Sequence, residues 1–153
     1  MIDGGFFRKR IQALYGNMTA QEAANFVSEY SIKHLNSNST KHLTANSSEL
    51  YRIFYYDCPP MSKKLFHPYL QKQVDFEKTD LYKWMIAFLD SLKSQRKIAL
   101  RLGFLADSQA HFSIRFDTTK KLCNGKMSWT DLKEEDFEIN VDQKGVDMKI
   151  GLD

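Results

Sequence analysis

The most constraining feature of this sequence is a run of β-branched and aromatic residues over positions 50–57, LYRIFYYD, which stops at Pro59 and Pro60. Apart from Arg52, the run is apolar on both faces, so a strand formed by it must be covered on both sides. Strands of this kind lie in the middle of parallel sheets, because helices cover both faces of such sheets. We therefore predict an α/β domain with a central, mainly parallel sheet.

The length and composition of the chain fit one folded domain. Its 153 residues are 42% hydrophobic and 13% aromatic, enough to form a buried core. The longest uninterrupted apolar run, residues 84–89, is far shorter than the roughly 20 residues that cross a bilayer, and the N-terminus lacks the basic and apolar stretches of a secretory signal. We expect a single cytoplasmic domain over residues 1–153 with no membrane contact.

Cysteine content and charge narrow the function classes further. Cys58 and Cys123 lie far apart and neither has a CxxC partner, so we expect two reduced thiols rather than a zinc site or a disulfide. The net charge of +3 gives no global basic field of the kind that attracts nucleic acid. The local cluster over residues 8–10, RKR, could still contact phosphates, although such a cluster is more often a solvated face.

Two helices are predicted in the first two thirds of the chain. Thr19 and Glu22 have the spacing of a capping box, and we place a helix over residues 20–35 that is followed by loop residues at 36–40 and 46–48. A second helix begins near Thr79. The positions expected to be buried are Ala23, Phe26, Val27, Tyr30 and His34 in the first helix and Leu81, Trp84, Met85, Phe88, Leu89 and Leu92 in the second.

Short strands follow after Lys97. Residues 98–105 and 111–116 are predicted to pair with each other in an antiparallel manner through a turn at Asp107 and Ser108. Asn124 and Gly125 indicate another turn, and residues 137–141 indicate a last strand. From Gly145 the sequence is typical of the first turns of a helix, and because it stops there we expect both ends of the domain to be trimmed.

Acidic residues at the ends of predicted strands give the main chemical hypothesis. Asp3 and Asp57 each follow an apolar strand segment, and the carboxyl ends of parallel strands lie along one edge, so the two could face the same cleft. Asp147, at the start of the last helix, would add a third carboxylate. Clustered carboxylates favour a hard cation such as Mg²⁺ or Mn²⁺, which can promote phosphodiester hydrolysis. The alternative is that these residues are turn residues and helix caps.

Asp153 stands apart from this set on geometric grounds. In a regular helix, residues six apart are separated by about 240° around the axis and about 9 Å along it. Asp147 and Asp153 therefore cannot bind one ion from the same regular helix. Asp147 is the favoured ligand, and Asp153 would serve a second ion or a water.

Several motifs, taken together and in order, resemble the NYN domain in its LabA/DUF88 branch, a group of PIN-like proteins. They span nearly the whole chain. The matching segments are residues 2–7 (IDGGFF), 51–57 (YRIFYYD) with Pro59 and Pro60, 101–103 (RLG), 143–147 (QKGVD) and the final Leu152 and Asp153.

The resemblance implies a PIN-like, Rossmann-like three-layer fold and a metal-dependent ribonuclease that uses Mg²⁺ or Mn²⁺ and binds RNA. It assigns the catalytic carboxylates to Asp3, Asp147 and Asp153, with Asp3 and Asp147 as metal ligands. Asp57 matches the strand end of the family, where its role is structural. Lys144, with Arg101 and Arg8, would contact the substrate.

The sequence departs from the family pattern at two places. Phe6 stands where many NYN domains have Asn, and the chain stops before the family's last strand and its Gly-Asp-Ser-Asp-like segment. We therefore expect a C-terminally incomplete domain whose open edge favours self-association or a partner protein. The competing hypothesis is a catalytically inactive NYN-fold module that binds nucleic acid or protein, and a phosphate enzyme for small molecules is a more distant third.

Overall fold

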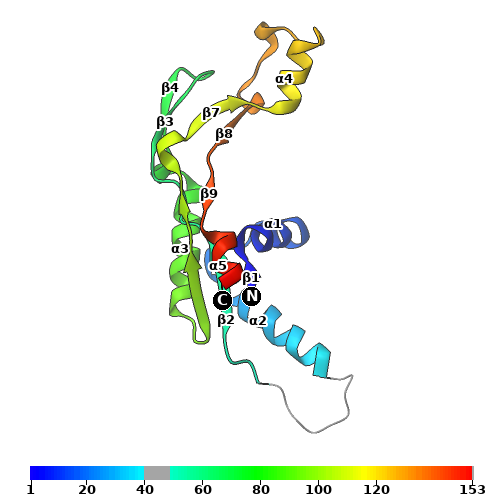
Figure 1. The fold of residues 1–153 in the computed structure, drawn as a ribbon, viewed down its shortest axis with the longest axis vertical. Helices are drawn as coiled ribbons and strands as arrows, with labels where there is room; N and C mark the ends of the chain where they lie inside the picture. Colours follow the sequence, from blue (N-terminus) through cyan, green and yellow to red (C-terminus); the bar gives the residue numbers. More distant parts are fainter. Residues whose placement is uncertain (40–48, 153) are drawn as a thin grey trace.

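The molecule is elongated, with a parallel sheet and most of the helices at one end and antiparallel strand pairs at the other (Figure 1). The structure is a computed structural model that describes residues 1–39 and 49–152. The predicted loop at 46–48 and the acidic residue Asp153 lie outside the described residues.

The centre of the first end is a three-stranded parallel sheet of order β1-β2-β5. β1 is Ile2–Asp3, β2 is Ile53–Asp57 and β5 is Ile98–Leu102. In the register, Tyr55 lies between Ile2 and Leu100. The predicted α/β class with a central parallel sheet is therefore confirmed.

The strand β2 is shorter than predicted from the sequence. Its first ladder bond is donated by the Ile53 N–H to the Lys97 carbonyl at 2.7 Å. Because β5 begins only at Ile98, residues 50–52 have no neighbouring strand to pair with. The predicted start at residue 50 is wrong, although the end at Asp57 is confirmed.

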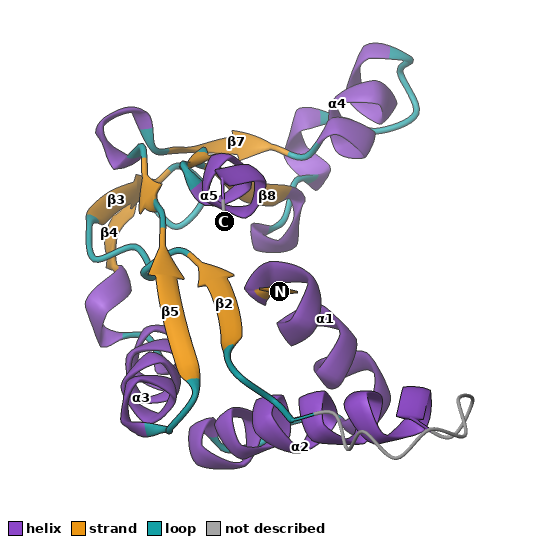
Figure 2. Ribbon diagram, turned by 60° about the horizontal axis from the view of Figure 1, so that its bottom comes forward, coloured by secondary structure: helices purple, strands orange, loops and turns teal. Residues whose placement is uncertain are grey.

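Three helices lie over one face of this sheet (Figure 2). They are α1 (Gly4–Tyr15), α2 (Ala20–Ser39) and α3 (Asp80–Ser94). Tyr55 is fully buried under them and packs edge-on against Phe7 and Phe88. The buried members of this core are Phe7, Ile11, Ala23, Ala24, Val27, Ile53, Tyr55, Met85, Phe88, Leu89 and Leu92.

The helices α2 and α3 both begin at capping threonines, of which Thr19 was identified as a cap from the sequence. The Thr19 N–H donates to the Glu22 carboxylate at 2.8 Å, and the Glu22 N–H donates to the Thr19 hydroxyl at 3.3 Å. At α3, the Thr79 hydroxyl accepts the Tyr82 N–H at 3.2 Å. Both predicted helix starts are confirmed, since these bonds satisfy amides that the first turn leaves open.

Some positions that were predicted to be buried are exposed. The helix α2 continues to Ser39 rather than ending at residue 35, and its second half extends beyond the core, so that Tyr30 is 52% exposed and His34 is also exposed. The prediction of loop at residues 36–39 is therefore wrong. Leu81, at 72% exposure, borders an open cleft instead of the core.

The other face of the sheet is covered by the last helix. α5 (Val146–Leu152) follows the short antiparallel pair of β6 (Phe104–Leu105) and β9 (Gln143–Lys144). A second buried cluster on this face contains Tyr56, Cys58 and Val146, with Ile150 packed against it. The predicted helix after Gly145 is confirmed, and β2 is covered on both faces as its composition requires.

The other end of the molecule, here called the strand lobe, comprises residues 62–79 and 106–142. It has two antiparallel strand pairs and one further helix. The sequence analysis did not predict this helix. β3 (Lys64–His67) pairs with β4 (Lys72–Asp75), and β7 (His111–Ile114) pairs with β8 (Phe137–Asn140). The missed helix is α4 (Phe116–Cys123), and short 3-10 turns lie at Phe76–Lys78, Asp107–Gln109, Trp129–Asp131 and Glu134–Asp136.

The predicted pairing of residues 98–105 with 111–116 is wrong. Residues 98–102 belong to the parallel sheet, and Phe104–Leu105 pairs with β9, so β7 takes β8 as its partner. The strand predicted at residues 137–141 and the turn at Gly125, where φ is +67°, are confirmed.

Within the described residues, no helix combines the length and apolar character required to cross a membrane. Cys58 is buried, Cys123 is exposed, and both are free thiols as predicted.

Candidate functional site

The carboxyl edge of the parallel sheet brings together the segments that the sequence analysis singled out. β1 ends at Asp3, β2 ends at Asp57, and Gly103 follows the end of β5. The Gly103 N–H donates to the Asp57 carbonyl at 2.8 Å. Asp3 and Asp57 thus do end neighbouring parallel strands at one edge, as predicted.

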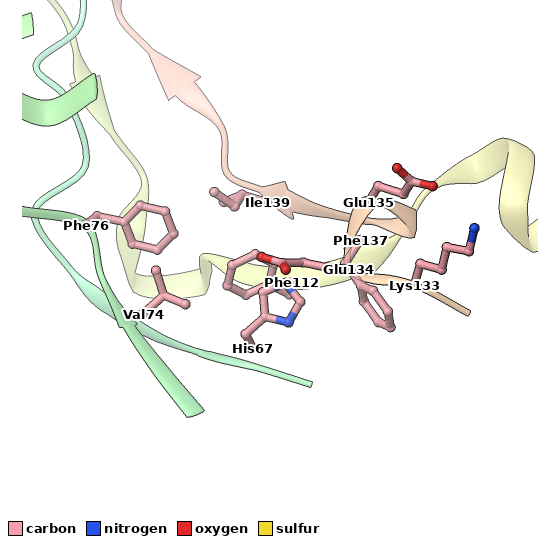
Figure 3. Close-up of a pocket in the computed structure, with 9 residues that line it drawn as sticks. All are labelled: His67, Val74, Phe76, Phe112, Lys133, Glu134, Glu135, Phe137 and Ile139. Atoms are coloured by element: carbon pink, nitrogen blue, oxygen red, sulfur yellow. The ribbon is translucent and has the colours of Figure 1, made fainter. Parts of the chain in front are cut away.

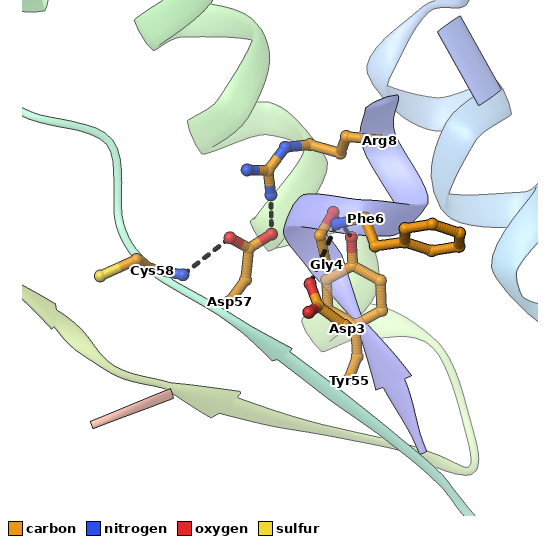
Figure 4. Close-up of polar contacts among 7 residues, drawn as sticks. All are labelled: Asp3, Gly4, Phe6, Arg8, Tyr55, Asp57 and Cys58. Atoms are coloured by element: carbon orange, nitrogen blue, oxygen red, sulfur yellow. Dashed lines mark hydrogen bonds and ion pairs between the residues drawn. The ribbon is translucent and has the colours of Figure 1, made fainter. Parts of the chain in front are cut away.

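Asp57 is a buried carboxylate that is neutralised by an arginine (Figure 4). Its side chain is 2% exposed and forms an ion pair with Arg8 of α1, whose side chain is 24% exposed. Its second oxygen accepts the Cys58 N–H at 2.7 Å. Burial lowers the pKa of Arg8, whereas Tyr55 and the negative charge of Asp3 raise it. Asp57 is therefore held inside the fold and does not face an open cleft.

Gly4 lets the first turn of α1 approach this carboxylate closely. A Cβ on Gly4 would lie 2.3 Å from Asp57 Oδ2 and 2.7 Å from Tyr55 Cε1. The Tyr55 hydroxyl donates to the Gly4 carbonyl at 3.5 Å. Burial raises the pKa of Tyr55, and the nearby charge of Arg8 partly opposes this increase. The role of Gly4 is thus to permit close packing of the first turn of α1 against β2.

Asp3 has a different environment from Asp57. It is exposed, and its carboxylate accepts the Phe6 N–H at 3.0 Å as the N-cap of α1. The strand register places Asp3 beside Tyr56, one position before Asp57. Asp3 is therefore a helix cap, where the alternative interpretation had made it a turn residue, and its second carboxylate oxygen has no hydrogen bond within the described part of the chain.

The last helix reaches the same edge of the sheet. A Cβ on Gly103 would lie 2.6 Å from the Lys144 carbonyl, so only glycine permits this approach. The Lys149 ammonium donates a hydrogen bond to the Leu102 carbonyl at 2.6 Å, and Val146 packs in the cluster with Tyr56. Asp147, next to Val146, is exposed in the first turn of α5.

The three residues predicted to contact the substrate differ in their exposure and in their partners. The Arg8 guanidinium is engaged with Asp57. Arg101 is half-buried and lies over the ring of Phe54, 5.3 Å from its centroid. Lys144 is exposed on β9, beside the close approach to Gly103. Of the three, Lys144 is the most accessible to a ligand in solution.

The donor set for a metal ion consists of exposed carboxylates. Among residues 1–39 and 49–152, no group of three or more His, Cys, Asp or Glu side chains is arranged to hold a metal ion. Asp57 is committed to Arg8, whereas Asp3 and Asp147 offer the oxygen ligands that Mg²⁺ and Mn²⁺ prefer. Their joint coordination of an ion stays a prediction.

A large cleft beside this edge was not found by sequence reasoning. Its volume is about 870 Å³, and it extends from Gly5, Arg8 and Lys9 of α1 past Pro59 to Phe76. A second cavity of about 710 Å³ lies in the strand lobe and shares Phe76 with the first. The interspersed aromatic residues near Phe76 were the available signal, but their convergence depends on strand pairings that local sequence does not specify.

Comparisons with known proteins found no relative of this chain. No family model, curated protein or solved structure matches the chain. The class that the structure defines is an α/β domain with a three-stranded parallel sheet flanked by helices and with small antiparallel strand pairs.

Proposed function

We propose that this chain is a metal-dependent ribonuclease of the NYN/PIN type, in which Asp3 and Asp147 hold Mg²⁺ or Mn²⁺. One observation carries the proposal: two exposed carboxylates come from segments that both adjoin Tyr56 at the carboxyl edge of a parallel sheet. Ligands of open α/β sheets bind at this edge. The order of the motifs along the sequence, which resembles that of NYN domains, supplies RNA as the substrate.

The side chains around this edge divide into those that bind and those that hold the edge in place. Lys144 and Lys9 are exposed cations that would attract the phosphates of a bound strand. Asp57 positions Arg8, which lines the 870 Å³ cleft and whose guanidinium has donors beyond the one used by Asp57. When bound, a divalent cation would supply Lewis-acid activation of the phosphodiester and of water.

Metal binding is tested by thermal unfolding with and without saturating Mn²⁺. At about 100 times the dissociation constant, a ligand specific to the folded state stabilises it by about 2.7 kcal/mol, which raises the melting temperature of a domain of this size by about 5 °C or more. Asp3→Asn and Asp147→Asn should abolish this increase. Since Asn caps helices as well as Asp does, Asp3→Asn removes the charge while retaining the cap on α1.

The matched control is Asp117→Asn, because Asp117 is also an exposed carboxylate in the first turn of a helix, α4. It should keep the full response to Mn²⁺. Cleavage of a labelled single-stranded RNA should require Mn²⁺ or Mg²⁺ and should be lost in the Asp3 and Asp147 variants. An unchanged melting temperature, together with RNA that is bound but not cut, would overturn the nuclease proposal in favour of an inactive binding module.

A further inference from the structure

The cavity in the strand lobe is lined by aromatic rings with charged residues at one side (Figure 3). His67 lies 4.3 Å from Phe112 and 5.5 Å from Phe137, measured between ring centroids. Phe76 stacks on Phe112 with centroids 6.2 Å apart. The cavity of about 710 Å³ also has Glu134 and Glu135 in its lining. Its walls therefore offer ring faces together with polar groups.

His67 provides a hydrogen-bond donor in this lining. The residue is only 4% exposed, and its Nδ1 accepts the Leu70 N–H at 3.3 Å. In the neutral ring the hydrogen must then be on Nε2. No hydrogen bond of Nε2 is found among the described residues, and Nε2 is not one of the fully enclosed unpartnered atoms, so it is a donor at the cavity surface that a ligand with an acceptor can reach.

Glu134 and Glu135 provide acceptors in the same lining. Both are exposed, and neither carboxylate has a hydrogen bond or an ion pair with another described residue. By contrast, Asp131 and Asp136 in the same segment each accept backbone N–H bonds. Figure 3 shows the Glu134 carboxylate directed toward the rings of His67 and Phe112 and the Glu135 carboxylate directed away from them, so Glu134 is the better placed acceptor for the donor groups of a ligand.

A planar ring with an amine beside a ring-nitrogen acceptor matches these three features. We propose that the cavity binds the adenine or cytosine base of a nucleotide, and in taking RNA as the source of that base the inference rests on the proposed function. The ring would stack on Phe112, the amine would donate to a glutamate, and the adjacent ring nitrogen would accept from His67 Nε2. A simple organic cation could pair with the glutamates, but it has no acceptor for the N–H group of His67.

The position of the cavity is consistent with a strand that also reaches the sheet edge. Phe76 and Ile139 line both this cavity and the 870 Å³ cleft, so the two spaces adjoin. The cleft extends to Arg8 and Lys9, whose charges suit phosphates. A base held at Phe112 would therefore belong to a nucleotide some distance along the strand from the phosphate at the edge.

The test is calorimetric titration of the full chain, without divalent metal, with AMP, CMP, GMP, UMP and ribose 5-phosphate. AMP and CMP should bind about tenfold or more tightly than GMP and UMP, since the latter present a carbonyl and a ring N–H in place of the amine and the acceptor. Ribose 5-phosphate should not bind detectably. Choline is included as an organic cation, and a preference for choline over AMP and CMP would refute the base pocket.

Variants separate the stacking contribution from the hydrogen bonds. Phe112→Leu should weaken AMP and CMP about tenfold, which is the loss expected for one stacking contact, while Phe116→Leu, on the exposed face of α4, should have no effect. The double substitution Glu134→Gln with Glu135→Gln should reduce the preference for AMP and CMP, and Glu138→Gln, outside the lining, should not. Circular dichroism checks that each variant is folded.

These measurements also distinguish this inference from the proposed function. Selective AMP and CMP binding that persists in Asp3→Asn, in a chain that does not cut RNA, would support the pocket and refute the nuclease. RNA cleavage by a chain that binds AMP no better than ribose 5-phosphate would support the nuclease and refute the pocket.

Discussion

Substitution of Arg8 tests the buried ion pair at the sheet edge. Arg8→Met keeps the aliphatic part of the side chain on α1 but leaves the Asp57 carboxylate, 2% exposed, without its cation. Removal of one partner of a buried pair typically costs about 3–5 kcal/mol, because the remaining charge is buried without compensation. The Cys58 N–H and the nearby first turn of α1 still favour the negative charge, so we expect a loss of about 3 kcal/mol.

The free energy of unfolding is measured by urea titration followed with far-UV circular dichroism. With a denaturant slope of about 2 kcal/mol/M, a loss of about 3 kcal/mol lowers the urea midpoint by about 1.5 M. Arg10→Met is the matched control, since Arg10 is on the same helix and exposed, and it should change stability by less than about 0.5 kcal/mol. If Arg8→Met also stays within about 0.5 kcal/mol of the parent chain, the pair does not hold the edge together.

The reverse substitution should be milder than the loss of the arginine. Asp57→Asn retains an acceptor for the Cys58 N–H, and Arg8, at 24% exposure, can extend its charge toward water. We expect a loss of about 1–2 kcal/mol, and the double variant should be more stable than the sum of the two single losses predicts. Strict additivity in this double-mutant cycle would contradict a direct interaction between the two side chains.

Three further predictions concern the glycines and one carboxylate. Gly4→Ala should lower stability by more than about 2 kcal/mol in thermal unfolding because its Cβ would lie 2.3 Å from Asp57 Oδ2, whereas Gly5→Ala, whose Cβ has its nearest contact at 3.4 Å, should be neutral or stabilising in the same helix. Gly103→Ala should expose Tyr56 by displacing α5, detectable as faster hydrogen exchange in β2, while Gly151→Ala, whose Cβ has open space, should not. Hydrogen bonds from the Lys133 N–H and, to a smaller extent, from the Thr118 hydroxyl lower the pKa of Asp136. The Asp136 carboxylate therefore contributes to stability at neutral pH, and this contribution disappears as the pH falls through its lowered pKa. Asp136→Asn should destabilise the chain at pH 7 and have little effect in strong acid, and equal effects at both pH values would contradict this.

The parallel sheet and the helices α2 and α3 could be predicted because their signals are local, whereas the helix α1 was not predicted. The apolar run that ends at Asp57 needs cover on both faces wherever it lies, and Thr19 and Thr79 cap their helices with atoms three residues away. The β3–β4 hairpin lacked such a signal, because its turn has Gln71 at φ +49° in place of a glycine or asparagine. The helix α4 was missed for a similar reason, since its N-cap, Arg115, makes no side-chain capping bond.

Strand partners could not be read from alternation alone. The period of two in residues 111–116 indicates a strand with one wet face, but it does not say which other strand supplies the ladder. β7 pairs with β8, about 25 residues later, while the nearer segment at 98–105 is divided between β2 and β9. The aromatic cavity depends on these pairings, which is why Phe112 and Phe137 were not grouped with His67 at the sequence level.

The two acidic strand ends show how one register position decides the use of a carboxylate. Both Asp3 and Asp57 follow apolar strand residues, and the sequence gives no reason to treat them differently. In the parallel register Asp3 lies beside Tyr56, so Asp57 is one position further along and, by strand alternation, on the face of Tyr55. That face is closed by α1, which presents Arg8, and the charge of Asp57 is therefore matched inside the fold. Asp3 remains exposed where β1 ends, and a ligand that needs a negative charge at this edge would find it there rather than at Asp57.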